Sequence, residues 1–324
     1  MLYVRKILKD QFGREITYLR LSVTDLCNLR CRYCMPEEGV CKKTHEEMLT
    51  EDEQVTAIEA AATLGITKVR ITGGEPLVKK NILSICRRIS KIPEIKEVCL
   101  TTNGIGLETM AVPLKEAGVN HLNISLDTLD EEKYGYITRV GKLKEALQGI
   151  ETAFEAGFDI IKINAVLIGG FNDNEIRNLA ELTCKYPMDV RFIELMPMPN
   201  SSDFGPEAYL SGEEVLKALP EATPVSFDGG TAKLYRLPGA KGRIGLIRPL
   251  SSNFCEICNR IRITADGKVK PCLHSDEEFN LKGCDKEEMT AILKEAIWRK
   301  PQWHGELSYE QKSHTHRSMN QIGG

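Results

Sequence analysis

The chain has 324 residues, 42% of them apolar and 27% charged, which is enough to bury a sizeable core in a barrel with a smaller attachment. Its formal net charge of −3 lacks the strong basic excess of a nucleic-acid-binding protein, although a few arginines can still gather around an anionic substrate. No apolar run approaches the roughly 18 residues that span a bilayer. The charged N-terminal stretch lacks the apolar core of a signal peptide, so we expect a cytoplasmic protein with neither a membrane nor a nucleic-acid partner.

From residue 18 to residue 197, a short β-rich run, a turn and a helical stretch follow one another repeatedly. This pattern predicts strands over Tyr18–Thr24, Lys68–Thr72, Glu97–Thr102, His121–Leu126, Ile160–Ile168 and Asp189–Met196. Amphipathic stretches predict helices over Glu51–Leu64, Asn81–Ser90, Leu107–Ala117, Lys142–Ala156 and Asn174–Lys185. Alternating strands and helices indicate parallel βαβ units. The six units show no symmetry between two halves of the chain, which favours an α/β fold with an incomplete (β/α)6 TIM-type barrel over a doubly wound sheet. Chemistry in such barrels lies at the carboxyl ends of the strands, where several polar motifs of this chain fall.

The repeating pattern ends after Pro197. Short runs punctuated by glycine follow, and the pair Asp266 and Gly267 is typical of the turn of a hairpin over Arg260–Pro271. A helix is predicted over Lys286–Trp298, and the chain closes on a polar tail that we expect to lack regular structure from Lys312 onward. We therefore divide the chain into a barrel over residues 1–224 and a smaller C-terminal α+β domain over residues 225–324.

The chain contains eleven cysteines, an odd number that argues against a disulfide framework in a large chain without an export signal. Three of them, Cys27, Cys31 and Cys34, follow the first predicted strand closely enough to bind one metal centre. A structural zinc would need a fourth ligand there, whereas a [4Fe–4S] cluster held by three thiolates keeps one iron open. Core packing is the expectation for the scattered cysteines, which are Cys41, Cys86, Cys99, Cys184 and Cys284.

A second group of three cysteines lies near the C-terminus: Cys255, Cys258 and Cys272. On its own this group fits a zinc ribbon with Cys284 as a fourth thiolate, but Cys284 belongs to a separate segment that begins a predicted helix. Arg260 and Arg262 alternate on the predicted strand inside the group, so their side chains point the same way. Two guanidinium groups beside a metal centre suit a bound polyphosphate.

The first cysteine group, with Tyr33 before its last cysteine, and the motif Gly73–Pro76 together resemble the radical S-adenosylmethionine (SAM) superfamily. The resemblance implies that the open iron binds the amino and carboxylate groups of SAM, and that one electron then cleaves SAM to a 5′-deoxyadenosyl radical. Glycine in the second motif suits a backbone that approaches the amino group of SAM closely, because a β-carbon would obstruct that approach.

Nearly the whole chain resembles the GTP 3′,8-cyclase family, the radical SAM enzymes of molybdenum cofactor synthesis. The motifs that carry the resemblance are Phe12–Arg14, Tyr18–Asp25, Cys27–Pro36, Arg70–Pro76, Thr101–Gly104, Asn123–Asp127, Arg191–Pro197, Phe254–Arg262, Thr264–Gly267 and Ser318–Gly324. The family removes hydrogen from C3′ of GTP, joins C3′ to C8 of guanine and yields 3′,8-cyclo-7,8-dihydroguanosine triphosphate. The resemblance implies two [4Fe–4S] clusters, one on each cysteine group, and SAM as cofactor.

Residue by residue, the resemblance assigns SAM contacts to Tyr33, Gly74, Ser125 and Met196. It assigns GTP contacts to Arg20, Arg70, Thr101, Lys162, Arg260 and Arg262, and a role at the active site to Gly323 and Gly324. Lys162 stands inside an apolar predicted strand, where lysine is rarely buried without a partner. The expected partners are GTP, an unidentified electron donor and, as user of the product, the cyclic pyranopterin monophosphate synthase; a homodimer is left open.

Two other functions fit parts of the pattern. A radical SAM peptide-modifying enzyme with an auxiliary cluster is one, although such domains typically carry more cysteines than this C-terminal group. A non-catalytic zinc-ribbon scaffold is the other. Of the six histidines, His314 and His316 alone show a spacing that suits metal binding, and we expect both to face solvent in the tail.

Overall fold

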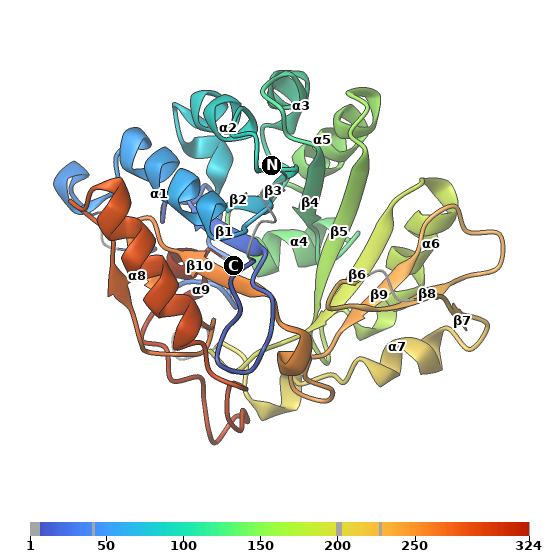
Figure 1. The fold of residues 1–324 in the computed structure, drawn as a ribbon. Helices are drawn as coiled ribbons and strands as arrows, with labels where there is room; N and C mark the ends of the chain where they lie inside the picture. Colours follow the sequence, from blue (N-terminus) through green and yellow to red (C-terminus); the bar gives the residue numbers. More distant parts are fainter. Residues whose placement is uncertain (1–6, 41–42, 199–202, 227–228, 324) are drawn as a thin grey trace.

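The computed structural model describes residues 7–40, 43–198, 203–226 and 229–323, and its centre is a curved parallel sheet with helices on its outer side (Figure 1). The barrel strands are β1 (Tyr18–Ser22), β2 (Lys68–Thr72), β3 (Glu97–Thr102), β4 (His121–Ser125), β5 (Ile160–Leu167) and β6 (Asp189–Glu194). The helices between them are α1 (Glu51–Thr63), α2 (Ile82–Ser90), α3 (Leu107–Glu116), α4 (Glu131–Thr138), α5 (Leu143–Glu155) and α6 (Ile176–Lys185). The predicted α/β partial barrel is confirmed.

The sheet does not close, because strands from the C-terminal third of the chain extend both of its edges. Beyond β6 lie β9 (Ile244–Ile247), β8 (Lys233–Arg236) and β7 (Thr223–Pro224), and beyond β1 lie β10 (Arg260–Ile263), β11 (Lys268–Lys270) and β12 (Phe279–Asn280). β10 runs parallel to β1, and β11 returns antiparallel to β10 as the predicted hairpin. The C-terminal third therefore adds strands directly to the barrel sheet.

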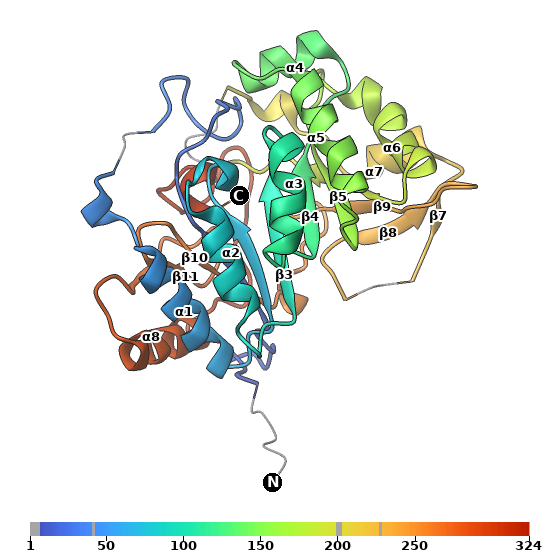
Figure 2. The same ribbon diagram turned by 90° about the horizontal axis from the view of Figure 1, so that it is seen from above.

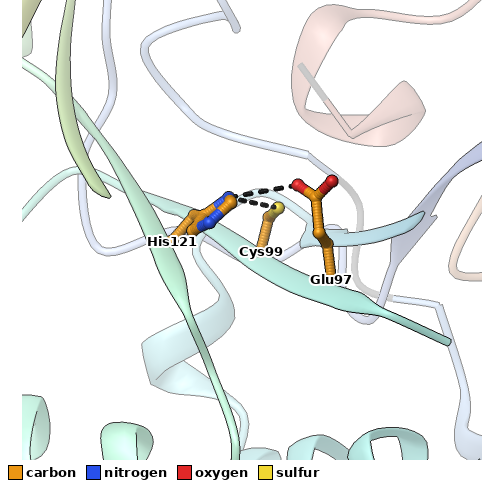
Figure 3. Close-up of side chains that lie close together, drawn as sticks. All are labelled: Glu97, Cys99 and His121. Carbon is orange, nitrogen blue, oxygen red and sulfur yellow. Dashed lines mark hydrogen bonds and ion pairs between the residues drawn. The ribbon is translucent and has the colours of Figure 1, made fainter. Parts of the chain in front are cut away.

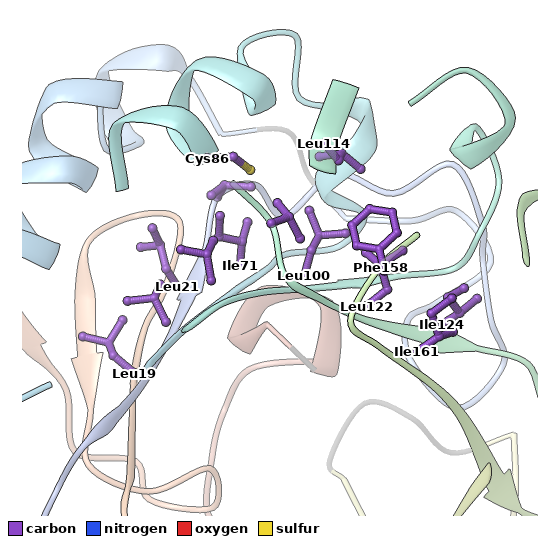
Figure 4. Packing of buried hydrophobic residues seen from close by; sticks show 14 of the residues in the cluster. Leu19, Leu21, Ile71, Cys86, Leu100, Leu114, Leu122, Ile124, Phe158 and Ile161 are labelled. Atoms are coloured by element: carbon purple, nitrogen blue, oxygen red, sulfur yellow. The ribbon is translucent and has the colours of Figure 1, made fainter. Parts of the chain in front are cut away.

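The main core lies between the sheet and its outer helices. Figure 4 shows Leu19 and Leu21 from β1 and Leu100 from β3 beneath Cys86 of α2 and Leu114 of α3, and all five are fully buried. Because side chains alternate along a strand, the residues between these leucines point to the inner face of the sheet. The inner face is thus left to polar side chains, and it carries the candidate site.

Local capping explains why several helices begin where they do. The Thr50 side chain accepts a hydrogen bond from the backbone amide of Glu53 at the start of α1, and the Glu53 carboxylate accepts one from the backbone amide of Thr50. Asp285 and Glu288 form the same capping box at the start of α8 (Lys286–Trp298), which packs beside α1 (Figure 1). The Glu53 carboxylate also accepts a hydrogen bond from the backbone amide of Gly283, and Lys286 forms a salt bridge with Glu59, so α8 is held beside α1.

The predicted strands and helices agree with the structure to within about two residues at each end. Three short helices were not predicted: α4, α7 (Glu213–Ala218) and α9 (Met319–Ile322). The tail beyond Lys312 was expected to lack structure, and α9 corrects that expectation, because Ser318 begins a capping box there and Ile322 is buried. Within the described ranges, no helix is long and apolar enough to cross a membrane.

Candidate active site

Three arginines form one row across the inner face. β10 pairs with β1 so that Arg262 stands opposite Arg20, and β1 pairs with β2 so that Arg20 stands opposite Arg70. Arg262 and Arg70 are buried, with 8% and 5% of their surface exposed. Register alone therefore places three guanidinium groups from distant parts of the chain side by side.

The charges in this row oppose one another. Burial, together with the cations of Arg70 and Arg260, lowers the pKa of Arg20 to about 10. Burial and the same kind of repulsion, from Arg20 and Arg260, lower the pKa of Arg262 well below its usual range. Among the described residues, no side-chain carboxylate forms a salt bridge with Arg70 or Arg262. Since buried charges are normally paired, the row suits a polyanionic ligand.

Tyr18 is the neighbour that compensates part of this charge. Its hydroxyl accepts a hydrogen bond from Nε of Arg70. Although burial opposes ionisation, the cations of Arg70 and Arg20 lower the pKa of Tyr18 to about 8. The sequence did not single out Tyr18, because its role depends on the pairing of β1 with β2, which brings its hydroxyl to Arg70.

The C-terminal segment reaches the arginine row. The carbonyl oxygen of Gly323 accepts hydrogen bonds from Nη1 of Arg262 at 2.9 Å and from Nη2 of Arg20 at 3.2 Å. Gly323 has φ +77°, and a β-carbon there would lie 2.3 Å from Oγ1 of Thr72. Both facts require glycine at this position. Gly324 lies outside the described residues.

The remaining predicted GTP contacts have different surroundings. Oγ1 of Thr101 accepts a long hydrogen bond of 3.4 Å from Nη1 of Arg70, so Thr101 belongs to the same polar face. Lys162 has an acidic neighbour, with Nζ 3.7 Å from Oδ2 of Asp189. Arg260 lies over the Phe254 ring, 5.0 Å from its centroid, beside the second cysteine group.

Two polar atoms on the inner face of β4 and β5 lack partners. Oδ1 of Asn123 and Oδ1 of Asn164 are buried and accept no hydrogen bond from any described residue. Asn123 stands opposite Lys162 and Asn164 opposite Ser125. An unpaired buried amide oxygen is costly, so these atoms indicate a space that a polar ligand fills. The sequence quoted Asn123 as part of a motif but did not predict a site role for it.

The first cysteine group lies in the loop after β1. Backbone amides of Arg30 and Arg32 donate hydrogen bonds to carbonyls of Thr138 and Ile137, which fixes this loop against the end of α4. Burial raises the pKa of Cys27 to about 11 and that of Cys34 to about 12, and it raises the pKa of Cys31 as well. The neighbouring cysteines add to the shifts of Cys31 and Cys34. Thiols in such a setting become thiolates when a metal centre supplies compensating positive charge.

The predicted SAM contacts lie around this loop. Tyr33 donates a hydrogen bond of 2.7 Å to Oδ2 of Asp127, whose pKa burial raises to about 6. Ser125 ends β4 and Met196 follows β6, so both lie at the carboxyl edge of the sheet. At Gly74, a β-carbon would lie 2.3 Å from the carbonyl oxygen of Leu26. The loop after β1 therefore approaches residue 74 so closely that only glycine fits there.

Glu75 is a residue of this motif for which the sequence suggested no role. Its buried carboxylate accepts hydrogen bonds from the Leu77 backbone, the Thr102 hydroxyl and the Asn103 backbone. Burial raises its pKa to about 7 despite these donors. Glu75 thus ties the end of β2 to the end of β3 and holds the site's edge in place.

The second cysteine group lies beside β10, where the short turn Cys255–Ile257 precedes the strand. Although burial opposes it, Lys300 and Arg260 lower the pKa of Cys258 to about 6. Nζ of Lys300 is fixed by the carbonyl oxygens of Arg260 and Pro271 at 2.8 Å and 2.7 Å. The surroundings of Cys258 therefore favour a thiolate.

Neither cysteine group has the spacing of a mononuclear zinc site. One tetrahedral zinc would hold its sulfur ligands about 3.8 Å apart. In the part of the chain that the structure describes, the only three Cys, His, Asp or Glu ligand atoms within 4.8 Å of one another belong to Glu97, Cys99 and His121. The wider spacing of both cysteine groups fits an iron–sulfur cluster, which bridges several metal atoms.

The scattered cysteines have mixed environments. Cys86 and Cys99 are buried, Cys184 and Cys284 are half-buried, and Cys41 lies outside the described residues. The charged neighbours of Cys284 are Glu288, Asp285 and Glu53, so it is not part of the second cysteine group. His314 and His316 are exposed, as expected.

Comparisons with known proteins agree with this geometry. Residues 21–183 match the Radical SAM superfamily and residues 188–306 match the Molybdenum Cofactor Synthesis C family. The chain is 48% identical to a GTP 3′,8-cyclase of Alkaliphilus metalliredigens, covering 98% of this chain and all of the relative. It is 44% identical to a GTP 3′,8-cyclase of Moorella thermoacetica, with the same two coverages.

Solved structures share the fold at low identity. SuiB of Streptococcus suis superposes with a TM-score of 0.66 at 14% identity, over 91% of this chain and 69% of SuiB. The protein anSMEcpe, solved with AdoMet bound, gives a TM-score of 0.56 at 17% identity, over 86% of this chain and 81% of that one. From its extended identity to the curated relatives, this chain belongs to the GTP 3′,8-cyclase family of radical SAM enzymes.

Proposed function

We infer that this chain is a GTP 3′,8-cyclase, which converts GTP to 3′,8-cyclo-7,8-dihydroguanosine 5′-triphosphate for molybdenum cofactor synthesis. The observation that carries this function is the row of Arg262, Arg20 and Arg70 on the inner face of a radical SAM barrel. Three buried guanidinium groups match a triphosphate, for which arginine provides paired donors.

The chain's own residues have separable tasks in this reaction. The arginine row holds the triphosphate, while Thr101, Lys162 and the amide oxygens of Asn123 and Asn164 line the adjoining inner face. Barrel walls exclude water from the reacting atoms. When bound, the first cluster and SAM supply the radical that removes hydrogen from C3′, and the second cluster supplies an open iron for the guanine.

The residues around the cofactors position them. We propose that Cys27, Cys31 and Cys34 hold the first [4Fe–4S] cluster and that Tyr33, Gly74, Ser125 and Met196 surround SAM. We also propose that Cys255, Cys258 and Cys272 hold a second [4Fe–4S] cluster. The wide spacing of both cysteine groups and the positive surroundings of Cys258 support these assignments.

We also propose that the chain divides into a barrel over residues 1–224 and a C-terminal domain over residues 225–324, and that the protein is cytoplasmic. Its proposed partners are an external electron donor, the cyclic pyranopterin monophosphate synthase as user of the product, and a second copy of the chain in a homodimer. A radical SAM peptide-modifying enzyme is the alternative function. SuiB, solved with its precursor peptide SuiA, resembles this chain at only 15% identity, which bears on the fold alone.

Anaerobic turnover of the reconstituted protein tests the function directly. With SAM, dithionite and GTP, we expect 5′-deoxyadenosine and the cyclised nucleotide in matching amounts. ATP in place of GTP should give no cyclised product. The proposal would be contradicted if SAM cleavage did not depend on GTP, or if a protein with both clusters formed no cyclised nucleotide.

A further inference from the structure

Glu97, Cys99 and His121 form a compact group away from both cysteine groups. Glu97 and Cys99 lie on β3, and His121 begins β4 directly opposite Cys99. Figure 3 shows the three side chains pointing toward one another from the two strands. The group therefore lies at the amino end of these strands, whereas the predicted SAM contacts Ser125 and Met196 lie at or beyond the carboxyl ends.

Distances within the group match the coordination of one metal ion. Nδ1 of His121 lies 3.3 Å from Oε2 of Glu97 and 3.6 Å from Sγ of Cys99. Zinc bound at about 2.0–2.1 Å to N and O and about 2.3 Å to S would separate N from O by about 3.3 Å and N from S by about 3.6 Å. The same two contacts are an ion pair and a hydrogen bond in the ion-free protein, drawn as dashed lines in Figure 3, and a bound ion would replace both.

The charges of the ligands suit a divalent ion. The hydrogen bond from His121, with Lys68 beside it, lowers the pKa of Glu97 to about 2, so this carboxylate is ionised. Although burial opposes it, the cation of Arg70 and the contact with His121 lower the pKa of Cys99. The contacts with Cys99 and Glu97 in turn raise the pKa of His121 to about 9, so the ion has to displace a proton from this imidazole. One carboxylate and one thiolate together balance a charge of two. Nζ of Lys68 also contacts Oε2 of Glu97 and holds the carboxylate toward the group.

An ion can reach the group from solvent. The Cys99 thiol is fully buried, but the side chains of His121 and Glu97 are 15% and 40% exposed. A carboxylate, a thiolate and an imidazole are the three ligand types of zinc, and three protein ligands leave a fourth position for water.

We propose that Glu97, Cys99 and His121 bind one Zn²⁺ ion, at a mononuclear site separate from both cysteine groups. Binding replaces the proton on Nδ1 of His121 and converts the Cys99 thiol to a thiolate, so up to two protons leave as the ion enters. The site does not rest on the cyclase function, since none of its three ligands is among the predicted GTP or SAM contacts.

The test uses the full chain with both iron–sulfur clusters reconstituted, so that the other cysteines are occupied. The protein is equilibrated anaerobically with Zn²⁺ alone and freed of excess ion, and zinc and iron are counted. X-ray absorption at the zinc edge then gives the ligands. We expect one zinc per chain with one sulfur at about 2.3 Å and the remaining ligands nitrogen or oxygen.

Single substitutions locate the ion. Cys99→Ser and His121→Gln should each weaken zinc binding by at least about 10-fold, while Cys184→Ser, at a half-buried cysteine of α6, should leave it unchanged. Unchanged iron content shows that each variant is folded. Zinc with two or three sulfur ligands, zinc retained in both Cys99→Ser and His121→Gln, or no zinc on the intact protein would each overturn the proposal.

Discussion

At the scale of single residues, Arg262 and Arg70 of the arginine row are buried, and among the described residues no side-chain carboxylate forms a salt bridge with either. Replacing Arg262 by alanine should weaken GTP binding by about 1.5–3 kcal/mol, the range for a hydrogen bond to a charged group. Guanosine binding should change much less, because guanosine lacks the triphosphate. The same result is expected for Arg260→Ala. Calorimetric titration of the reconstituted enzyme with both ligands measures the difference.

Arg236→Ala is the matched control, since this arginine is exposed on β8 at the far edge of the sheet. It should bind GTP as the intact enzyme does. An equal loss of GTP and guanosine binding in Arg262→Ala would mean that the arginine supports the fold and does not hold the triphosphate.

Tyr18 gives the arginine row a pH dependence. Its pKa of about 8 lies below the usual value near 10, so the phenol is neutral below pH 8 and becomes a tyrosinate above it. A tyrosinate pairs with Arg70 and Arg20 and competes with the triphosphate for them. GTP affinity should therefore fall as the pH rises from 7 to 9, by at most about tenfold per pH unit.

Tyr18→Phe isolates this effect, because phenylalanine keeps the ring and removes the ionisable hydroxyl. Its GTP affinity should be nearly constant over the same pH range. A profile that falls equally in both proteins would assign the pH dependence to another group.

The residues that the sequence failed to identify are those whose role depends on register. His121 has no histidine or cysteine neighbour at metal-binding spacing along the chain, and it meets Cys99 only because β3 and β4 pair in parallel. Asn123 and Asn164 likewise need the fold to show that their amide oxygens are unpaired. Arg262 was noticed through its alternation with Arg260 on a predicted strand, and Arg20 through a family motif. Neither signal showed that the two arginines lie side by side, because that depends on the pairing of β1 with β10.

At the scale of elements, hydrophobic alternation and helical periodicity predicted β1–β6 and the longer helices well, because each has one face in the main core. The same signals fail for α4, α7 and α9, which have eight, six and four residues. A helix of one or two turns has too few positions to display a period. It forms where caps and tertiary contacts support it.

The helix α9 positions the end of the chain. Nδ2 of Asn320 donates a hydrogen bond to the carbonyl of Asp25, and the Asn320 backbone amide donates one to the Cys34 thiol. Buried Ile322 anchors the helix, and Gly323 then contacts the arginines. This short helix therefore connects the first cysteine group with the arginine row.

Gly323→Ala should abolish cyclisation while both clusters remain, because the β-carbon conflicts with Thr72 and the positive φ strains any other residue. Deleting Gly323 and Gly324 should have the same effect. Iron content, GTP binding and product formation are measured together. Gly305→Ala, which meets open space at a similar φ of +82°, controls for backbone strain alone. Full activity in the truncated chain would contradict this role.

At the scale of the whole molecule, one continuous set of contacts joins the two cysteine groups. Cys34 contacts α9, Gly323 of the same segment contacts Arg20 and Arg262, and Arg262 lies within electrostatic reach of Cys272. The open sheet makes this possible, because β10 joins β1 and brings the C-terminal third to the barrel's first strand. Substrate bound to the arginines would therefore lie between the two cysteine groups.

This arrangement predicts a division of labour between the two groups. Cys31→Ala should abolish SAM cleavage, because the loop after β1 loses the cluster that generates the radical. Cys258→Ala should retain some SAM cleavage that is uncoupled from cyclisation, since the first group and its SAM contacts are intact. Each variant should hold one cluster's worth of iron, half that of the intact enzyme.

Iron content, 5′-deoxyadenosine and cyclised nucleotide, measured on the same anaerobic samples, distinguish these outcomes. Cys184→Ala is the control, because Cys184 belongs to neither group and should leave all three quantities unchanged. If either variant kept the full iron content, its cysteine would not be a ligand. If both variants lost SAM cleavage equally, the two groups would act as one unit, since removing the distant Cys258 would then disable radical formation at the loop after β1.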